Sequence, residues 1–283
     1  MSSAGELLRR GSARLRGLPG IDPALDAHLL LMKATGWSEA RLWTGIDRDV
    51  PPAVALRFLK LVARRRARTP LAYLTGEKEF WSLGFRVFPG VLIPRPETEI
   101  LVEAVLGCSS RRPETIVEIG TGSGCVAIVL ALELPAARIL AVDRSRRALR
   151  AARLNAARHD AAAVSWHEGN FFEPLAGLVR AGRVDLVASN PPYVPEAEWA
   201  GLEPEVRDHE PKRALAAGLD GLDFIRRLTA ESRTYLRRGG SLVFEIGAGQ
   251  AGPVGKLFGT DWEPPVFFPD LAGIPRVVLV RRR

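Results

Sequence analysis

The chain has 283 residues, 47% of them hydrophobic and 25% charged, with a formal net charge of +8. This composition is typical of a globular protein with a sizeable core, and no uncharged apolar run of about 18 residues predicts a membrane-spanning helix. The two cysteines and four histidines lack metal-ligand spacing, so we expect no metal site, no disulfide framework and a cytoplasmic location. The positive charge favours an acidic partner only weakly, because most basic residues are arginine, a bias that genome composition also produces.

Residues 1–75 are predicted to form a small helical domain. Apolar residues recur at helical spacing, as in Leu25, Leu29 and Met32, and glycines and prolines separate the segments. The domain ends in a basic run at residues 64–68. Such a run is either a solvated helix end or a contact for an acidic partner.

Residues 76–111 are expected to link this domain to the rest of the chain. Aromatic and β-branched residues around Gly84 predict a β-hairpin at residues 80–87. Pro96, which is followed by carboxylates, predicts the start of a helix that runs to about Leu106. A polar linker is expected at residues 111–114.

Residues 112–283 alternate between predicted strands and helices. The alternation predicts an α/β fold with a Rossmann-like, doubly wound sheet. No helical run separates the last two strands, so a closing hairpin with an antiparallel last strand is expected. Strands are predicted at 115–119, 138–143, 164–168, 184–189, 241–246, 266–268 and 277–280, and helices at 125–134, 145–158, shortly after 173 and at 222–237.

The predicted strand at residues 184–189 runs into the loop Asn190-Pro191-Pro192-Tyr193. Each proline fixes its own φ and lacks a backbone N–H, so the four residues form a stiff loop. The Asn190 side-chain oxygen and the free backbone carbonyls can accept hydrogen bonds from a planar –NH2 group. The loop therefore favours methylation of an amide or an exocyclic amine, although a plain strand-ending turn would use the same prolines.

A glycine-rich turn follows the first strand of this region, in the sequence Glu118-Ile119-Gly120-Thr121-Gly122-Ser123-Gly124. Its spacing differs from that of the dinucleotide-binding motif. Asp143 ends the next strand, where a carboxylate can accept both hydroxyl groups of a ribose. Glu118 can interact with an ammonium group, directly or through water. A ribose and an ammonium without a pyrophosphate favour S-adenosylmethionine over NAD, and Phe171, after the third strand, either covers the adenine or belongs to the core.

The glycine turn, Asp143 and the Asn190 loop, in this order, resemble the amino-group methyltransferases that use S-adenosylmethionine. Further motifs narrow the resemblance to the N5-glutamine methyltransferases of peptide chain release factors, over nearly the whole chain. These motifs lie at Ile93–Glu99, Ser189–Tyr193, Glu210–Leu215, Gly218–Leu222 and Asp270–Gly273.

The resemblance implies a role for each candidate site residue. S-adenosylmethionine, converted to S-adenosylhomocysteine, would contact Glu118, Gly120, Thr121, Gly122, Ser123, Gly124, Asp143, Asn170, Phe171 and Asn190. Asn170 stands where relatives often carry an acid, but its carbonyl oxygen can still accept from the adenine amino group. Asn190, Pro191 and Tyr193 would be catalytic. The substrate glutamine of a Gly-Gly-Gln motif would be held by Asn190, Pro191, Pro192, Tyr193 and Arg95.

The resemblance also divides the labour along the chain. Residues 1–75 would dock the release factor, residues 76–111 would form the hairpin and helix linker, and residues 112–283 would form the methyltransferase domain. We expect no membrane partner and no direct binding to nucleic acid, and we favour a monomer.

Other functions remain open from the sequence. A glutamine methyltransferase of a large-subunit ribosomal protein would share the loop chemistry. A DNA or RNA amino-group methyltransferase would flip its target base and would need a larger recognition domain. A non-catalytic module that binds S-adenosylmethionine would be expected to have a changed Asn190 or a broken glycine turn, and a dehydrogenase is disfavoured by the glycine spacing.

Overall fold

The computed structural model describes residues 2–108 and 113–283. By their contacts these residues form two compact units. The first runs to Glu77 and also includes Glu203–His209, and the second consists of Lys78–Leu202 and Glu210–Arg283. The expected boundary between residues 111 and 112, and the start of the expected polar linker, lie outside the described residues.

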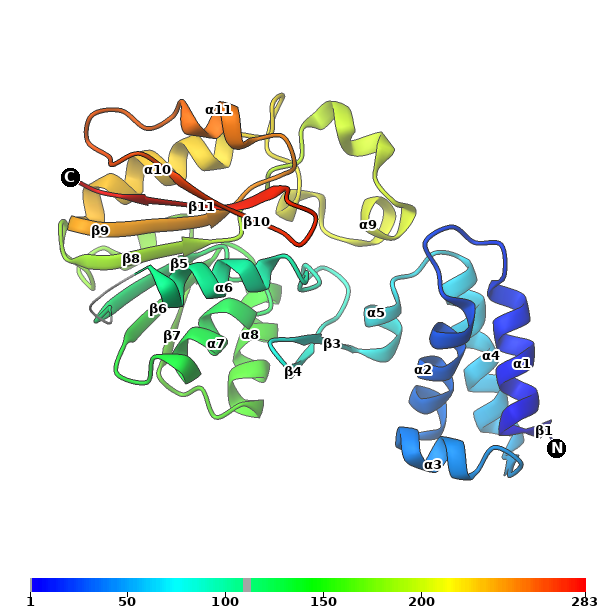
Figure 1. Cartoon of the computed structure of the whole chain (residues 1–283). Helices are drawn as coiled ribbons and strands as arrows, with labels where there is room; N and C mark the ends of the chain where they lie inside the picture. The colour runs from blue at the N-terminus through cyan, green and yellow to red at the C-terminus, as the bar shows by residue number, and fades with distance from the viewer. Residues whose placement is uncertain (1, 109–112) are drawn as a thin grey trace. The chain divides into compact units, whose positions relative to one another are not determined.

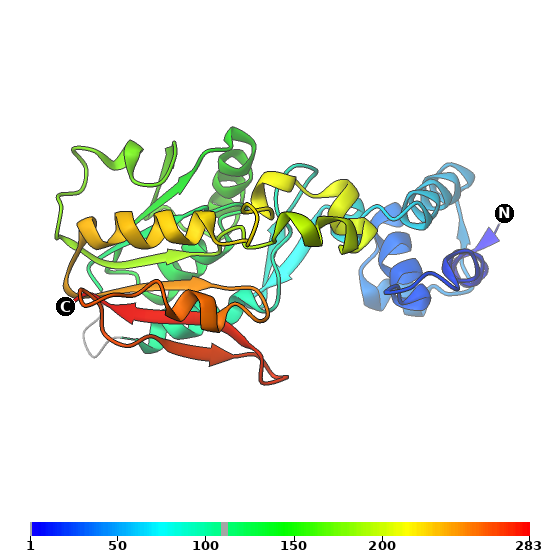
Figure 2. The same cartoon turned by 90° about the horizontal axis from the view of Figure 1, so that it is seen from above.

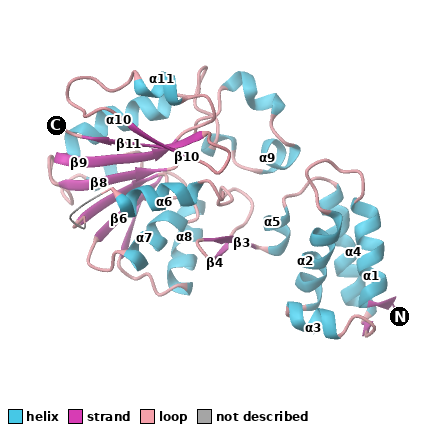
Figure 3. Cartoon of the chain, viewed as in Figure 1, coloured by secondary structure: helices cyan, strands magenta, loops and turns pink. Residues whose placement is uncertain are grey.

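The first unit is helical, apart from a two-residue pairing of β1 (Ser2–Ser3) with β2 (Asp49–Val50) (Figure 3). Side chains at the helix starts cap the free N–H groups, as Asp22 does for Ala24 and Leu25. The apolar faces of the helices share one core that includes Leu30, Phe58 and Val62. The helices are α1 (Ala4–Leu15), α2 (Pro23–Thr35), α3 (Glu39–Thr44), α4 (Pro52–Arg66) and α5 (Leu71–Thr75), with α9 (Pro204–His209) joining them from later in the chain.

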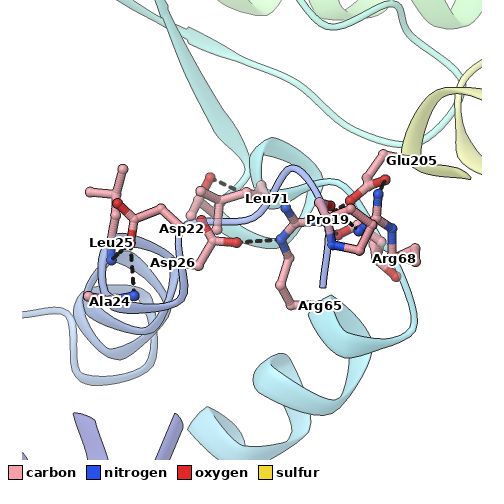
Figure 4. A network of polar contacts seen from close by, with 11 residues as sticks. Pro19, Asp22, Ala24, Leu25, Asp26, Arg65, Arg68, Leu71 and Glu205 are labelled. Carbon is pink, nitrogen blue, oxygen red and sulfur yellow. Dashed lines mark hydrogen bonds and ion pairs between the residues drawn. The ribbon is translucent and has the colours of Figure 1, made fainter. Parts of the chain in front are cut away.

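A buried ion network attaches the late segment to the early helices (Figure 4). Arg65, in the last turn of α4, lies 2.5 Å from Asp26 of α2 and 2.8 Å from Glu205 of α9. Arg68 makes a second ion pair with Glu205, at 2.5 Å. The basic run at 64–68 is therefore not simply a solvated helix end, because two of its arginines have carboxylate partners within this unit.

The second unit is built on a seven-stranded sheet with the order β10-β11-β9-β8-β5-β6-β7 (Figure 1). The five strands from β9 to β7 are parallel to one another, whereas β11 is antiparallel to both of its neighbours. The predicted Rossmann-like sheet with an antiparallel last strand is confirmed. The strands are β5 (Thr115–Ile119), β6 (Arg138–Asp143), β7 (Val164–Glu168), β8 (Val184–Ser189), β9 (Leu236–Glu245), β10 (Val266–Pro269) and β11 (Pro275–Arg281).

Helices cover both faces of this sheet. Successive residues of a strand point to opposite faces, so Ile116 belongs to one core cluster and Val117 to the other. In Figure 1, α6 (Thr98–Gly107), α7 (Cys125–Glu133) and α8 (Arg146–Arg158) lie below the sheet. The helices α10 (Asp223–Tyr235) and α11 (Ala251–Gly255) lie above it and face the viewer in Figure 2.

Some predicted boundaries differ from the structure. The strand β9 begins at Leu236 rather than at residue 241, because Leu236 pairs with Val184 before a register shift in the ladder. This pairing ends α10 at Tyr235, two residues earlier than predicted. The predicted hairpin is present as β3 (Glu77–Phe80) and β4 (Leu83–Arg86), and α6 begins at Thr98, just after the predicted start at Pro96.

Short elements fill the connections of this unit. They are η1 (Glu173–Leu175), η2 (Glu196–Gly201) and η3 (Lys212–Ala214). Over the described ranges, no helix combines the length and apolar character that a membrane crossing needs.

Candidate active site

The candidate residues gather where the strands β5, β6, β7 and β8 end. The glycine turn follows β5, Asp143 ends β6, Asn170 and Phe171 follow β7, and the Asn190 loop follows β8. Since β5 pairs with both β6 and β8, these carboxyl ends are neighbours at one edge of the sheet. This edge is where open α/β sheets bind their ligands.

The glycine turn requires glycine for backbone reasons. Gly120, Gly122 and Gly124 have φ values of 80°, 57° and 83°, which L-residues with side chains rarely adopt. A Cβ on Gly124 would also lie 2.9 Å from the Cβ of Ala152 and 3.0 Å from the ring of Trp166. Gly124 thus allows the start of α7 to pack closely, whereas Gly120 and Gly122 line the pocket described below.

Two carboxyl groups with raised pKa values lie beside this turn. Burial raises the pKa of Glu118 to about 7, against the effect of a hydrogen bond from the Thr121 hydroxyl. Burial also raises the pKa of Asp143, although two backbone N–H groups oppose the shift. The Gly122 N–H donates to Asp143 Oδ2 at 2.9 Å, and the Ser145 N–H donates to Asp143 Oδ1 at 2.8 Å. Each oxygen keeps a second acceptor site, so Asp143 can still bind two hydroxyl groups.

An aromatic side chain, Phe171, lines the same pocket as Asp143. Phe171 is 6% exposed, and its ring centroid lies 4.4 Å from that of Phe224, so it both lines the pocket and belongs to the core. The guanidinium of Arg227 lies 4.2 Å from the same ring. Asn170 lines the pocket beside Phe171.

Hydrogen bonds connect the Asn190 loop to two other elements, α6 and β9. The Asn190 Nδ2 group donates to the Thr98 hydroxyl at 2.9 Å, and that hydroxyl donates to Glu245 Oε2 at 2.7 Å. The hydroxyl of Tyr193 donates to Glu245 Oε1 at 3.0 Å. Burial raises the pKa of Glu245 to about 7 and also raises the pKa of Tyr193.

Arg95 is held by a carboxylate from a distant part of the sequence. Its guanidinium pairs with Glu210, which is 6% exposed and also accepts from the backbone N–H of Ile93 at 3.0 Å. Arg95 lines a pocket together with Pro191 and Tyr193. Glu210 therefore fixes the loop that brings Arg95 to the Asn190 loop.

Three pockets adjoin one another, and Asn190 lines all three. The largest, about 710 Å³, carries Asp143, Asn170 and Phe171 on its wall. The second, about 350 Å³, is lined by Glu118, Thr121 and Ser123 among others, and the third, about 250 Å³, by Arg95 and the whole Asn190 loop. Of the candidate residues, Gly124 alone lines none of these three pockets.

Known proteins resemble this chain over nearly its whole length. The family model "PrmC N-terminal domain" matches residues 6–76, and the model "Methyltransferase small domain" matches residues 96–201. A release factor glutamine methyltransferase of Nitratidesulfovibrio vulgaris is 41% identical over 98% of this chain and 94% of its own length. One from Moorella thermoacetica is 42% identical over 99% and 97% of the two chains.

The chain belongs to the release factor glutamine methyltransferase family.

A solved structure, that of a methyltransferase from Pyrococcus furiosus, is more distant in sequence from this chain. It is 19% identical, with a TM-score of 0.54 over 77% of this chain and 98% of that structure. At this identity the likeness concerns the fold alone.

The sequence did not identify four residues that take part in the site. Thr98 and Glu245 support Asn190, and Phe224 packs on Phe171. Arg213 lines the same pocket as Asp143 and donates to Ser145 Oγ at 2.9 Å. Thr98 and Arg213 lie within two of the motifs that carry the family resemblance, which was the available indication. Glu245 directly follows the apolar run Leu242–Phe244 at the end of β9, and a carboxylate in that place was the unusual feature.

Proposed function

We propose that this protein transfers a methyl group from S-adenosylmethionine to the side-chain amide nitrogen of the glutamine in the Gly-Gly-Gln motif of peptide chain release factors. Family membership at about 40% identity over nearly the full length supports the activity. The observation that carries the proposal is the position of Asn190, which lines both the acid-bearing pockets and the pocket of Arg95 and Tyr193. An amide acceptor placed there can meet a substrate amide on one side and a methyl donor on the other.

The residues present fit S-adenosylmethionine. Asp143 keeps acceptor sites for two ribose hydroxyls, Phe171 and Asn170 offer an aromatic face and an amide acceptor for the adenine, and buried Glu118 offers a partner for the ammonium. Gly120 and Gly122 let the ligand approach the backbone closely. When bound, S-adenosylmethionine supplies an electrophilic methyl group on a sulfonium and becomes S-adenosylhomocysteine. No step of the proposal uses a metal.

The chain's own contribution is position and electrostatics. The Asn190 side-chain oxygen and the Pro191 carbonyl accept the two N–H groups of the glutamine amide, which directs the nitrogen lone pair at the reacting carbon. A near-attack distance of about 3–3.5 Å is what such positioning provides. No strong base is needed before transfer, because the nitrogen loses its proton after the methyl group arrives. Tyr193 and Pro192 exclude water, and Arg95 shapes the entrance.

The remaining assignments follow from this activity. We assign docking of the release factor to the first unit, because the residues proposed for cofactor and glutamine all belong to the second unit. We further propose a cytoplasmic monomer whose partner is a release factor rather than a membrane or a free nucleic acid.

Mass spectrometry of a release factor after incubation with the enzyme and S-adenosylmethionine tests the function. We expect one added methyl group on the glutamine of Gly-Gly-Gln and none when that residue is changed to glutamate, because the carboxylate lacks N–H donors and faces two oxygen acceptors. Methylation of a ribosomal protein or of RNA in place of the release factor would contradict the proposed substrate.

Asn190→Ala is the matched enzyme variant. It should keep the fold and lower the turnover number by about 10²-fold or more, because a misplaced reactant can cost that much. Turnover close to that of the wild type would remove Asn190 from the mechanism.

A further inference from the structure

Thr98 and Glu245 form a short chain of hydrogen bonds that ends on the side-chain amide of Asn190. Thr98 is 2% exposed and Glu245 is 1% exposed, so the hydrogen bond between these two side chains is shielded from water. They belong to α6 and β9, and neither was a candidate from the sequence.

An asparagine amide has two orientations, which exchange the positions of its oxygen and its –NH2 group. The two orientations have nearly the same shape, so hydrogen-bond partners decide which one is present. For a proposed acceptor of a substrate –NH2 group, the choice matters greatly. If Asn190 presented its own –NH2 group to the substrate, two donors would face each other and the glutamine would not be held.

The direction of the hydrogen bonds can be followed from Glu245. Above its pKa of about 7 the Glu245 carboxylate is ionised and only accepts, so the hydroxyl of Thr98 donates its single proton to Oε2. The hydroxyl of Tyr193 occupies Oε1 in the same way. With its proton committed to Glu245, the Thr98 oxygen can only accept from Asn190, and the group that donates is Nδ2, at 2.9 Å.

We propose, on the basis of the proposed function, that Thr98 and Glu245 are positioning residues that select the Asn190 orientation in which the side-chain oxygen faces the substrate amide. Glu245 sets the direction of these hydrogen bonds, and Thr98 transmits that direction to Asn190. The same carboxylate also holds Tyr193, so one buried group aligns both ends of the Asn190 loop. Neither Thr98 nor Glu245 needs to touch the reacting atoms.

Thr98→Val tests this inference, because valine keeps the shape of threonine and lacks the hydroxyl. Without the Thr98 oxygen, both orientations of the Asn190 amide become accessible. We expect kcat on a release factor to fall by roughly tenfold, the size of effect that one hydrogen bond produces. Thr98→Ser keeps the hydroxyl and should restore kcat to near the wild-type value. Calorimetric titration should show that both variants still bind S-adenosylmethionine, which reports an intact second unit.

Thr229→Val is the matched control. Thr229 is 6% exposed in α10, and its hydroxyl has no hydrogen-bond partner among the described residues. This variant makes the same chemical change at a buried threonine that is not linked to Asn190. Its kcat should equal that of the wild type.

A double-mutant cycle separates positioning from general structural support. If Thr98 acts through Asn190, Thr98→Val should have no further effect on single-turnover rates in an Asn190→Ala background. An additive loss in that background, or a wild-type kcat for Thr98→Val, would overturn the inference. Thr98→Ala gives the same comparison if the second methyl group of valine disturbs the packing. Failure of the wild type to methylate the glutamine would instead reject the proposed function.

Discussion

Two buried carboxyl groups with similar pKa values have different surroundings. Glu118 accepts a hydrogen bond from Thr121 and lines a pocket, whereas Glu245 has a hydroxyl group on each of its oxygens. Burial raises both pKa values to about 7, so ligand binding near either group should couple to its protonation. Glu118 is the one that the proposed ammonium group would meet.

Cofactor affinity should therefore depend on pH. An ammonium beside Glu118 favours its ionised form and lowers its pKa, so binding releases a proton and the affinity rises as the pH approaches 7 from below. We expect a several-fold tighter dissociation constant at about pH 7 than at about pH 5.5. Calorimetry in buffers of different ionisation enthalpy would detect the released proton. Glu118→Gln should bind more weakly and with little dependence on pH, and an unchanged pH profile in this variant would show that another group titrates.

A second prediction concerns the effect of Asp143 on the affinity for S-adenosylmethionine. Asp143→Ala removes the proposed ribose acceptor together with the partners of the Gly122 and Ser145 N–H groups. A charge-assisted hydrogen bond contributes roughly 1.5–3 kcal/mol, so the dissociation constant of S-adenosylmethionine should rise by at least about tenfold. Asp143→Asn keeps one acceptor oxygen and should give an intermediate value in the same titration. Equal affinity for all three proteins would make Asp143 a structural residue only.

Residues that carry a recognisable motif could be predicted from the sequence, and residues that support them could not. Asn190 and Asp143 are identified by their place at strand ends, and the structure brings both to one pocket. Glu245 lies 55 positions after Asn190, and its contact with Thr98 depends on how α6 packs on the sheet. Such a contact is set by tertiary packing, which no local pattern records.

At the scale of elements, the turn that contains Gly221 packs against the Asn190 loop. Gly221 has a φ of 75°, and a Cβ at this position would lie 2.2 Å from the carbonyl oxygen of Tyr193 and 2.9 Å from Gln250 Nε2. Gln250 Nε2 itself donates to that carbonyl at 2.9 Å. The turn that precedes α10 therefore packs directly against the backbone of the loop.

Gly221→Ala should displace the loop as well as strain the turn. The left-handed conformation alone costs alanine about 1–2 kcal/mol. Gly249→Ala is a matched control, because Gly249 has a φ of 81° and a Cβ added there would have nothing within 4 Å. We expect both variants to lose stability in thermal unfolding and only Gly221→Ala to lose kcat beyond that. Equal kcat values would mean that the turn does not control the loop.

Regular elements were predictable where the apolar period was strong, as in β5, β6, β7 and β8, whose bounds match the predicted ones. The start of β9 was missed because Arg237, Arg238 and two glycines interrupt the apolar pattern, and only pairing with β8 makes this segment a strand. The short helices between β8 and α10 have little periodicity. Their positions depend on contacts such as that between Glu205 and Arg65.

At the scale of the whole molecule, the Glu205 carboxylate joins α9 to the early helices. Its side chain is 12% exposed, and it pairs with both Arg65 and Arg68. Glu205→Gln would leave two arginine charges with Asp26 as the remaining carboxylate in the network of Figure 4. We expect a loss of unfolding free energy of up to about 3 kcal/mol, because removing one partner of a buried pair leaves an uncompensated charge.

A neighbouring residue of α9 provides the control for Glu205. Asp208 pairs with Arg207 at the surface, with side chains 50% and 36% exposed. Asp208→Asn should therefore leave stability unchanged within error in chemical denaturation. Similar losses in the two variants would indicate that charge on α9, rather than the buried network, controls stability.

The contact between α9 and the early helices also determines how this protein can be divided. Because Glu203–His209 belongs to the first unit while the residues on both sides of it belong to the second, the polypeptide passes between the units three times. One cut near Glu77 separates the early helices from α9, which belongs to the same fold. A fragment that starts at Lys78 would carry α9 as an unpartnered helix, and the complementary fragment would expose Arg65 and Asp26. Separately produced halves of this enzyme should therefore bind each other, and they could serve as a two-part reporter whose assembly restores methylation.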